Sequence, residues 1–145
     1  MSEQAKAYKK TICIDFDGVI HSYERGWQEG ELYGTVTEGF FEWANEAQKK
    51  FNLVIYSSRS SNLEMIKKMK NWLLEQFLKQ TGLEMEIPKW QFAEKKPPAW
   101  ITIDDRCICF EGSWAALELQ PNMIEDFKIG WILHIERQDV ERIGG

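Results

Sequence analysis

The sequence has few cysteines and no long hydrophobic run, and each shortage excludes a class of protein. Its 145 residues include three cysteines. No two cysteines have the C-x-x-C spacing of a zinc half-site, and an odd number does not suit a disulfide framework. We therefore expect reduced thiols and a cytoplasmic protein. No apolar stretch approaches the length of a membrane span, and the polar N-terminus lacks the apolar segment of a signal peptide, so no membrane association is expected.

Basic residues are outnumbered as well. Lys and Arg together number 18 against 23 Asp and Glu, which gives a formal net charge of −5. An acidic chain has no electrostatic reason to bind nucleic acids or anionic membranes non-specifically. The proportions of hydrophobic residues (43%) and charged residues (28%) are those of a folded globular chain. We expect a single domain over residues 1–145, with a loosely held N-terminus at residues 1–10.

Short runs of β-favouring apolar residues predict the strands of a sheet. The clearest run is residues 11–14, which leads into two aspartates and a glycine and predicts a strand over residues 11–16. Similar runs occur at residues 53–56 and 100–103, with weaker candidates at 90–92 and 107–110. Apolar runs of this length are typical of buried parallel strands.

Two amphipathic patterns lie between these runs and predict helices. A capping box of Thr35 and Glu38 predicts the start of the first helix, and one of Ser61 and Glu64 predicts the start of the second. Gly82 predicts the end of the second helix. The apolar stripes that follow the two boxes are Phe40, Ala44, Ala47 and Phe51, and then Leu63, Ile66, Met69, Leu73 and Phe77. Strands that alternate with helices predict an α/β fold with a mainly parallel sheet and helices on both faces.

Polar residues gather directly after the predicted strands. These residues are Asp15, Asp17, Gly18, Ser57, Ser58, Asp104 and Asp105. The carboxyl ends of parallel strands lie along one rim of the sheet, where ligands of such folds bind. Carboxylates placed close together resist ionising unless a cation compensates their charge, and Mg²⁺ prefers carboxylate oxygens. The sequence therefore predicts a Mg²⁺ site at this rim.

The same rim offers the groups that phosphoryl transfer requires. Besides the carboxylates and the Ser57 hydroxyl, an ammonium group is supplied by Lys95 or Lys96. Phosphoryl transfer needs the charge on the phosphoryl oxygens to be neutralised and the attacking and leaving oxygens to be aligned. An aspartate can be phosphorylated and then hydrolysed, which divides one difficult step into two easier ones.

In their order along the chain these groups resemble the four motifs of the haloacid dehalogenase (HAD) superfamily of phosphohydrolases. The matching segments are Asp15-Phe-Asp17-Gly18-Val19, the strand ending in Ser57, Lys96-Pro97 and Ile103-Asp104-Asp105. The resemblance covers residues 11–112, and it implies a Rossmann-like three-layer α/β/α sandwich with residues 11–16 in a central strand. It also implies a flap over residues 18–34. Many members of the family have threonine at the position of Val19, a departure that removes a hydroxyl but no catalytic group.

The resemblance also implies catalytic roles for the first motif. Asp15 would be the nucleophile and a Mg²⁺ ligand. Asp17 would protonate the leaving oxygen and later activate water, and its main-chain carbonyl would bind the metal.

The remaining motifs would hold the phosphate and the metal. Ser57 and the backbone N–H groups near Gly18 and Ser58 would bind the phosphoryl group. Lys96 would hold the phosphate, with Lys95 as the alternative. Asp105 is favoured as the direct metal ligand and Asp104 as its support, because adjacent residues on an extended chain point to opposite sides; the reverse assignment stays open.

The substrate is suggested only by what the chain lacks. The intervals at residues 18–35 and 82–99 are too short to form a separate cap domain, so we expect an open, uncapped site. In the family, uncapped members act on bulky phosphorylated substrates. The expected substrate is a phosphorylated nucleic-acid end, a nucleotide or a protein. Alternatively, a partner subunit in a homo-oligomer could close the site.

The leading hypothesis is therefore a Mg²⁺-dependent phosphomonoester hydrolase that uses an aspartyl-phosphate. A receiver-like signalling domain is an alternative, but receivers carry their acidic pair on the first strand, whereas here the adjacent pair comes last. A non-catalytic phosphate- or metal-binding module on a similar fold is the other alternative.

Two other residues lie near the motifs. His21 is expected on the surface of the flap rather than as an acid–base group. Arg59 could contact the substrate, but a structural ion pair is favoured. Residues 129–145 fit either a strand or a helix, and their sequence assigns them no role.

Overall fold

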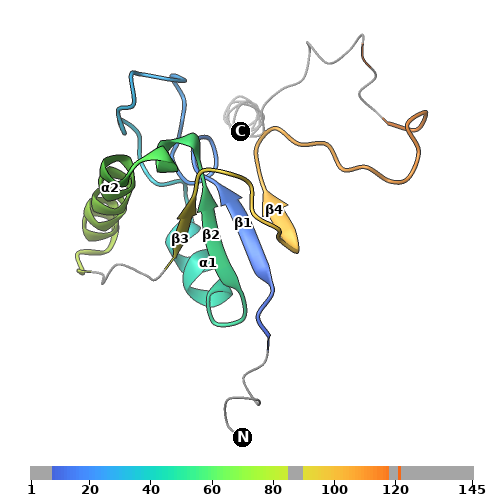
Figure 1. Ribbon diagram of the computed structural model, residues 1–145. Helices are drawn as coiled ribbons and strands as arrows, with labels where there is room; N and C mark the ends of the chain where they lie inside the picture. The colour runs from blue at the N-terminus through green and yellow to red at the C-terminus, as the bar shows by residue number, and fades with distance from the viewer. Residues whose placement is uncertain (1–7, 85–89, 118–120, 122–145) are drawn as a thin grey trace, which may run out of the picture. The chain divides into compact units, whose positions relative to one another are not determined.

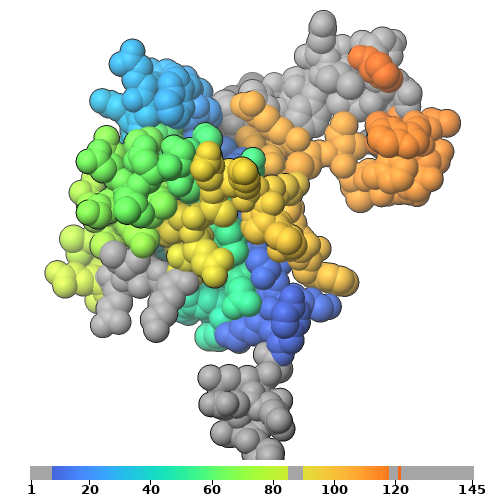
Figure 2. Space-filling model, viewed as in Figure 1, coloured from blue at the N-terminus to red at the C-terminus, as the bar shows by residue number. Residues whose placement is uncertain are grey.

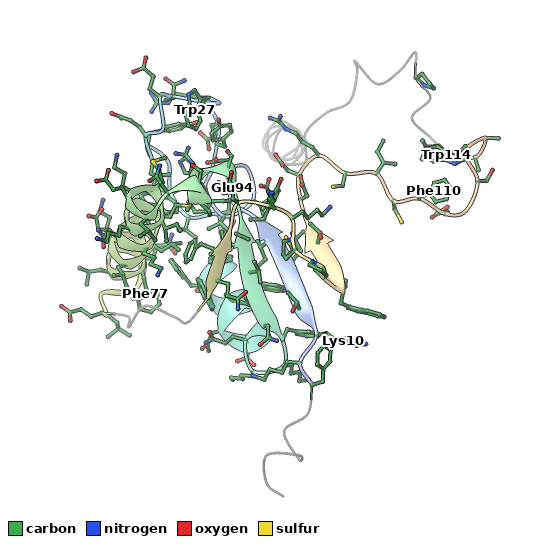
Figure 3. The ribbon with its side chains drawn as sticks, in the orientation of Figure 1. Lys10, Trp27, Phe77, Glu94, Phe110 and Trp114 are labelled. Atoms are coloured by element: carbon green, nitrogen blue, oxygen red, sulfur yellow. The ribbon has the colours of Figure 1, made fainter. Side chains whose placement is uncertain are left out.

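A computed structural model describes residues 8–84, 90–117 and 121 of the chain (Figure 1). The chain divides into two compact units, Met1–Ile103 and Asp104–Gly145. All the helices and strands found in the described residues lie in the first unit. In the second unit the described residues form turns and extended chain, with Phe110 and Trp114 in ring contact (Figure 3).

The first unit contains a sheet of four parallel strands. These are β1 (Thr11–Asp15), β2 (Asn52–Tyr56), β3 (Gln91–Ala93) and β4 (Ile101–Ile103), and they lie in the order β3-β2-β1-β4. β1 is an inner strand, as expected from the sequence. Its register places Ile14 opposite Ile55 on β2 and opposite Ile103 on β4. The carboxyl ends of β1 and β4 therefore lie side by side.

The two helices in the described residues lie on the same side of this sheet. α1 (Phe40–Ala47) connects β1 to β2, and α2 (Leu63–Thr81) leads from β2 towards β3. The connections from β1 to β2 and from β2 to β3 each lead to the next strand on the same side. Because such crossovers are right-handed, two that run in the same direction place their helices on the same face of the sheet. The ring contact between Phe41 of α1 and Phe77 of α2, with 5.1 Å between centroids, agrees with this placement.

The connection from β3 to β4 steps back across the sheet in the opposite direction. It consists of residues 94–100. Figure 1 shows this segment (yellow) in front of the sheet and α1 behind it, and in Figure 2 yellow atoms lie on the face turned to the viewer. The expectation of helices on both faces is therefore not met in the part of the chain that the structure describes. What is observed is an α/β fold with an all-parallel sheet and helices packed on one face.

The hydrophobic core lies between the sheet and the two helices. Ile14 and Ile55 come from the sheet, while Met69 and Trp72 come from α2, and all four are at most 6% exposed. Burying side chains of this size stabilises the fold by about 1.5–3 kcal/mol each. This core fixes the strand ends, and with them the polar residues that follow.

The helix starts differ from those predicted. α1 begins after Gly39, which has a φ of 82° and provides no side-chain cap, so the Thr35–Glu38 capping box is wrong. α2 is capped by Asn62, whose side chain accepts a hydrogen bond from the Met65 N–H, so the Ser61–Glu64 box is also wrong, by one residue. The end of α2 at Gly82, in the left-handed conformation with a φ of 73°, is confirmed.

Two further predictions fail for clear reasons. Leu63 was placed on the apolar stripe of the second helix but is 76% exposed, because it is the first residue of α2 and precedes the turns that reach the core. Residues 107–110 form no strand: they lie in the second unit, are exposed, and pair with no described strand.

The flap segment, residues 18–34, is built from turns rather than from paired strands. At its base, His21 forms an antiparallel bridge with Val36. The N-terminal residues 1–7 and the tail at 129–145 lie outside the described residues. No helix in the described part of the chain is long and apolar enough to cross a membrane.

Candidate functional site

The neighbouring strands β1 and β4 form a topological switch point, because the connections that follow β1 lead to one side of it and the connection into β4 leads to the other. Strands β2 and β3 extend the sheet to one side of β1, and β4 is added on the other side. In open parallel sheets, ligands bind beyond the carboxyl ends of the strands at such a point. Asp15 is the last residue of β1, and Asp104 is bonded to the last residue of β4. Since Ile14 pairs with Ile103, the sheet register itself assigns neighbouring positions to these two aspartates.

Three of the predicted metal ligands come together here. One carboxylate oxygen from each of Asp15, Asp104 and Asp105 lies within 4.8 Å of the others. Mg²⁺ binds oxygen at about 2.1 Å, so two ligands on opposite sides of the ion are about 4.2 Å apart. The three carboxylates are therefore close enough together to be candidate ligands of one Mg²⁺ ion.

The electrostatics of the adjacent pair agree with a need for positive charge. Burial raises the pKa of Asp105, and the hydrogen bond and charge of Asp104 raise it further. Asp104 also accepts a hydrogen bond from the backbone N–H of Arg106, at 2.9 Å. A cation would relieve the repulsion between the two carboxylates.

The predicted phosphate-binding groups are only partly free to act. The backbone N–H of Gly18 donates to the carbonyl of His21 at 2.8 Å, so it is already used inside the loop. Ser57 is 5% exposed, and its Oγ accepts from the backbone N–H of Arg59 at 3.1 Å. A hydroxyl can accept and donate at once, so Ser57 keeps its proton available for a ligand. Ser58 is exposed and begins a short 3₁₀ turn.

The structure does not decide between the two candidate lysines. Lys95 and Lys96 both follow β3 in the connection to β4, and both are exposed. Neither makes a hydrogen bond or ion pair among the described residues. Their roles stay predictions, as do those of Gly18, Ser57 and Ser58.

Asp17 has closer partners than the sequence suggested. Its Oδ2 accepts from Arg59 Nε at 2.9 Å, and its Oδ1 accepts from Arg59 Nη2 at 3.2 Å, which makes a two-pronged ion pair. Oδ1 also lies 2.9 Å from Nδ1 of His21. The expected structural ion pair of Arg59 therefore exists, and its partner is one of the two predicted catalytic aspartates.

These partners set the charge of Asp17. Burial alone would raise the pKa of its carboxyl group, but hydrogen bonds from His21 and Arg59, together with the Arg59 charge, outweigh burial and lower the pKa below its usual value. Asp17 is therefore held as a carboxylate in this conformation.

His21 is fully buried, contrary to the expectation of a surface residue in the flap. Its ring is packed edge-on against Trp72 and Tyr33, each with 5.1 Å between centroids, and stacks on Phe16. The sequence carries a weak signal for this network: His21 lies four residues after Asp17, and Arg59 directly follows the serines at the end of β2. Nothing in those spacings, however, predicts that the three side chains meet.

A separate hollow lies beside the flap. It has a volume of about 460 Å³ and is lined by flap residues 29–32 and by four residues of α2, Lys68, Asn71, Trp72 and Glu75. None of the predicted site residues lines it. The switch point between β1 and β4 is therefore the better candidate on chemical grounds.

Comparisons with known proteins add no assignment to this geometry. No protein-family model matches the chain, and neither curated proteins nor solved structures gave a match.

Proposed function

We propose that the protein is a Mg²⁺-dependent phosphomonoester hydrolase of the HAD type, in which Asp15 is the nucleophile. One observation carries the proposal: Asp15 and the Asp104–Asp105 pair end neighbouring strands at the switch point of a parallel sheet. Phosphoryl transfer depends mainly on positioning and charge neutralisation, to which a bound metal contributes, and an aspartate can serve as its nucleophile.

The residues would divide the work as follows. Asp15, Asp104 and Asp105 would hold Mg²⁺, which supplies charge neutralisation at the phosphoryl oxygens when bound. The Ser57 hydroxyl would donate a hydrogen bond to the phosphoryl group, and Lys96 or Lys95 would add a positive charge.

The substrate class follows from the open surroundings of these residues. The flap of residues 18–34 contributes turns and no separate folded cap. We propose a substrate whose phosphate projects from a larger body, such as a phosphorylated nucleic-acid end, a nucleotide or a phosphoprotein. A panel of these compounds, assayed for phosphate release, would rank the classes.

The decisive experiment measures hydrolysis of a chromogenic aryl phosphate with and without Mg²⁺. Wild type is expected to turn over only with the metal, and Asp15→Asn to lose turnover even with it. Glu38→Gln, which removes an exposed acid next to α1, is the matched control and should keep full activity. Activity that persists in Asp15→Asn would reject the proposed nucleophile.

A non-catalytic phosphate- or metal-binding module is the second candidate, and one observation favours it. The Asp17 carboxylate, expected to transfer protons, is instead engaged by Arg59 and His21. Saturable binding of Mg²⁺ and phosphate without turnover on the whole panel would select this candidate over the hydrolase.

A further inference from the structure

Arg59 is a buried cation that joins three segments of the first unit. Its side chain is 1% exposed, and it grips Asp17 with two nitrogens. Its third nitrogen, Nη1, donates to the carbonyl of Gly30 in the flap at 2.7 Å. The indole ring of Trp27, at the outer part of the flap in Figure 3, stacks over the guanidinium with 4.9 Å from the centroid to Cζ. The guanidinium therefore binds Asp17 through Nε and Nη2, Gly30 through Nη1, and the Trp27 ring through one face. With three different partners, Arg59 has little freedom to move.

His21 also hydrogen-bonds the Asp17 carboxylate. Its Nε2 accepts a hydrogen bond from the backbone N–H of Gly34 at 3.1 Å, and an amide N–H can only donate. Nε2 therefore carries no proton, so the ring proton lies on Nδ1 and is donated to Asp17 Oδ1. A Cβ at Gly34 would collide with Ser22 and would lie 3.2 Å from His21 Nε2, so the absence of a side chain there lets the backbone approach both residues.

We propose that Arg59 and His21 are positioning residues that hold the Asp17 carboxylate in one orientation for the reaction, and that Arg59 ties the flap to the same carboxylate. This inference rests on the proposed function. Three donated hydrogen bonds take up three of the about four acceptor positions of the Asp17 carboxylate, which leaves about one for a substrate or water. The same guanidinium anchors Gly30, so the position of the flap and the orientation of Asp17 depend on one side chain.

The fork shape of arginine matters as well as its charge. A lysine ammonium keeps the charge but cannot reach both carboxylate oxygens and the Gly30 carbonyl from one rigid plane. Arg59→Lys is therefore expected to preserve the fold while it loosens Asp17, and Arg59→Met removes the grip entirely. Arg25→Met is the matched control, because Arg25 lies in the same flap and stacks on Tyr33 without contacting Asp17.

The kinetic test compares kcat and KM of these variants for an aryl phosphate. Misplacing a catalytic group by about 1 Å can cost roughly 100-fold in rate. We expect kcat to fall about 100-fold in Arg59→Met and about 10-fold in Arg59→Lys, with KM within about twofold of wild type, and no change in Arg25→Met. A rise in KM with unchanged kcat would mean that Arg59 binds substrate instead, and wild-type kinetics in Arg59→Met would mean that it has no role in the reaction. Either result overturns the proposal.

A second measurement does not depend on turnover. Nitrogen-15 NMR of the imidazole rings distinguishes a protonated from an unprotonated nitrogen, and His21→Gln assigns the His21 signals. The hydrogen bonds predict a proton on Nδ1 of His21 and none on Nε2, in wild type and in Arg59→Lys. A proton on Nε2 would overturn the proposed grip on Asp17. If wild type shows this tautomer but hydrolyses nothing on the panel, the proposed function fails and the catalytic role of the pair fails with it. If wild type is active and the variants match it, only the present inference fails.

Discussion

Replacing Arg59 by methionine is expected to reduce the free energy of unfolding by about 3 kcal/mol. Methionine keeps much of the apolar stem, so the change removes mainly the guanidinium and its hydrogen bonds. Those bonds go to both oxygens of Asp17 and to the carbonyl of Gly30, at 2.7–3.2 Å. The perturbation therefore leaves one carboxylate without its charge partner and one carbonyl without a donor.

The magnitude follows from how deeply the pair is buried. Removing one member of a buried ion pair typically costs about 3–5 kcal/mol, because the other charge is left without compensation. Arg59 is 1% exposed, but the Asp17 side chain is 21% exposed and keeps the His21 hydrogen bond, so water and His21 recover part of the loss. The lower end of the range, about 3 kcal/mol, is expected for Arg59→Met. Asp17→Asn should cost at least as much, because it strands the more deeply buried partner.

The assay is urea unfolding of wild type, both single variants and the double variant. Domains typically have an unfolding free energy of about 5–15 kcal/mol, so a change of about 3 kcal/mol is well resolved. The double-mutant cycle should give a coupling energy of about 2 kcal/mol, because once Arg59→Met has left the Asp17 charge without its partner, Asp17→Asn removes that unpaired charge. Arg25→Met, which removes an exposed arginine from the same flap, should change stability by less than about 0.5 kcal/mol. A loss below about 1 kcal/mol in Arg59→Met, or additive single variants, would refute the described ion pair.

Three further outcomes are expected. The pKa of Asp17 is lowered in the folded protein from the ordinary value of 3.8. The ionised carboxylate therefore stabilises the fold fully above pH 3.8, and this stabilisation is lost as the pH falls through the lowered pKa. Acid unfolding of Asp17→Asn should lack this pH-dependent loss, and a curve identical to that of wild type would contradict the prediction. Gly34→Ala places a Cβ 2.5 Å from the carbonyl oxygen of Ser22, so thermal unfolding should show a loss of about 1–3 kcal/mol, and an unchanged midpoint would show that the loop relaxes freely. Asn62→Ala removes the cap of α2 and should cost about 1 kcal/mol in urea unfolding, whereas Ser61→Ala should cost little; the reverse order would restore the capping box predicted from the sequence.

The strands and their polar ends were predictable because the signals are local. An apolar run such as residues 11–16 is specified by its own residues, and β1 covers Thr11–Asp15. The order of elements then implies that Asp15 and Asp104 end strands of one parallel sheet. The handedness of the crossovers would also have placed both helices on one face, had the strand order been known. For the two helices, the part of the order that matters is β3-β2-β1, which no local residue pattern specifies.

The helix caps and the Asp17 network were not predictable for different reasons. Ser61 and Asn62 are both good caps, and the choice of Asn62 depends on how the chain leaves the 3₁₀ turn at Ser58–Ser61. The network depends on the path of the flap, because His21 is buried only when Gly34 returns to contact it. Contacts between residues 17, 34 and 59 are long-range in sequence, and no periodicity encodes them.

The contacts of Asp17 also constrain the role that the family resemblance gives it. A general acid must carry a proton at the working pH, whereas three hydrogen-bond donors favour the Asp17 carboxylate. In the described conformation Asp17 is suited to accept a proton from water, which is the second half of the proposed reaction. The first half would then proceed without an acid, and that is easiest for leaving groups that are stable as anions, such as aryl oxides. An alkyl phosphate ester would instead require Arg59 to release Asp17 first. The ratio of aryl to alkyl phosphate turnover therefore reports on whether the grip of Arg59 persists when substrate is bound.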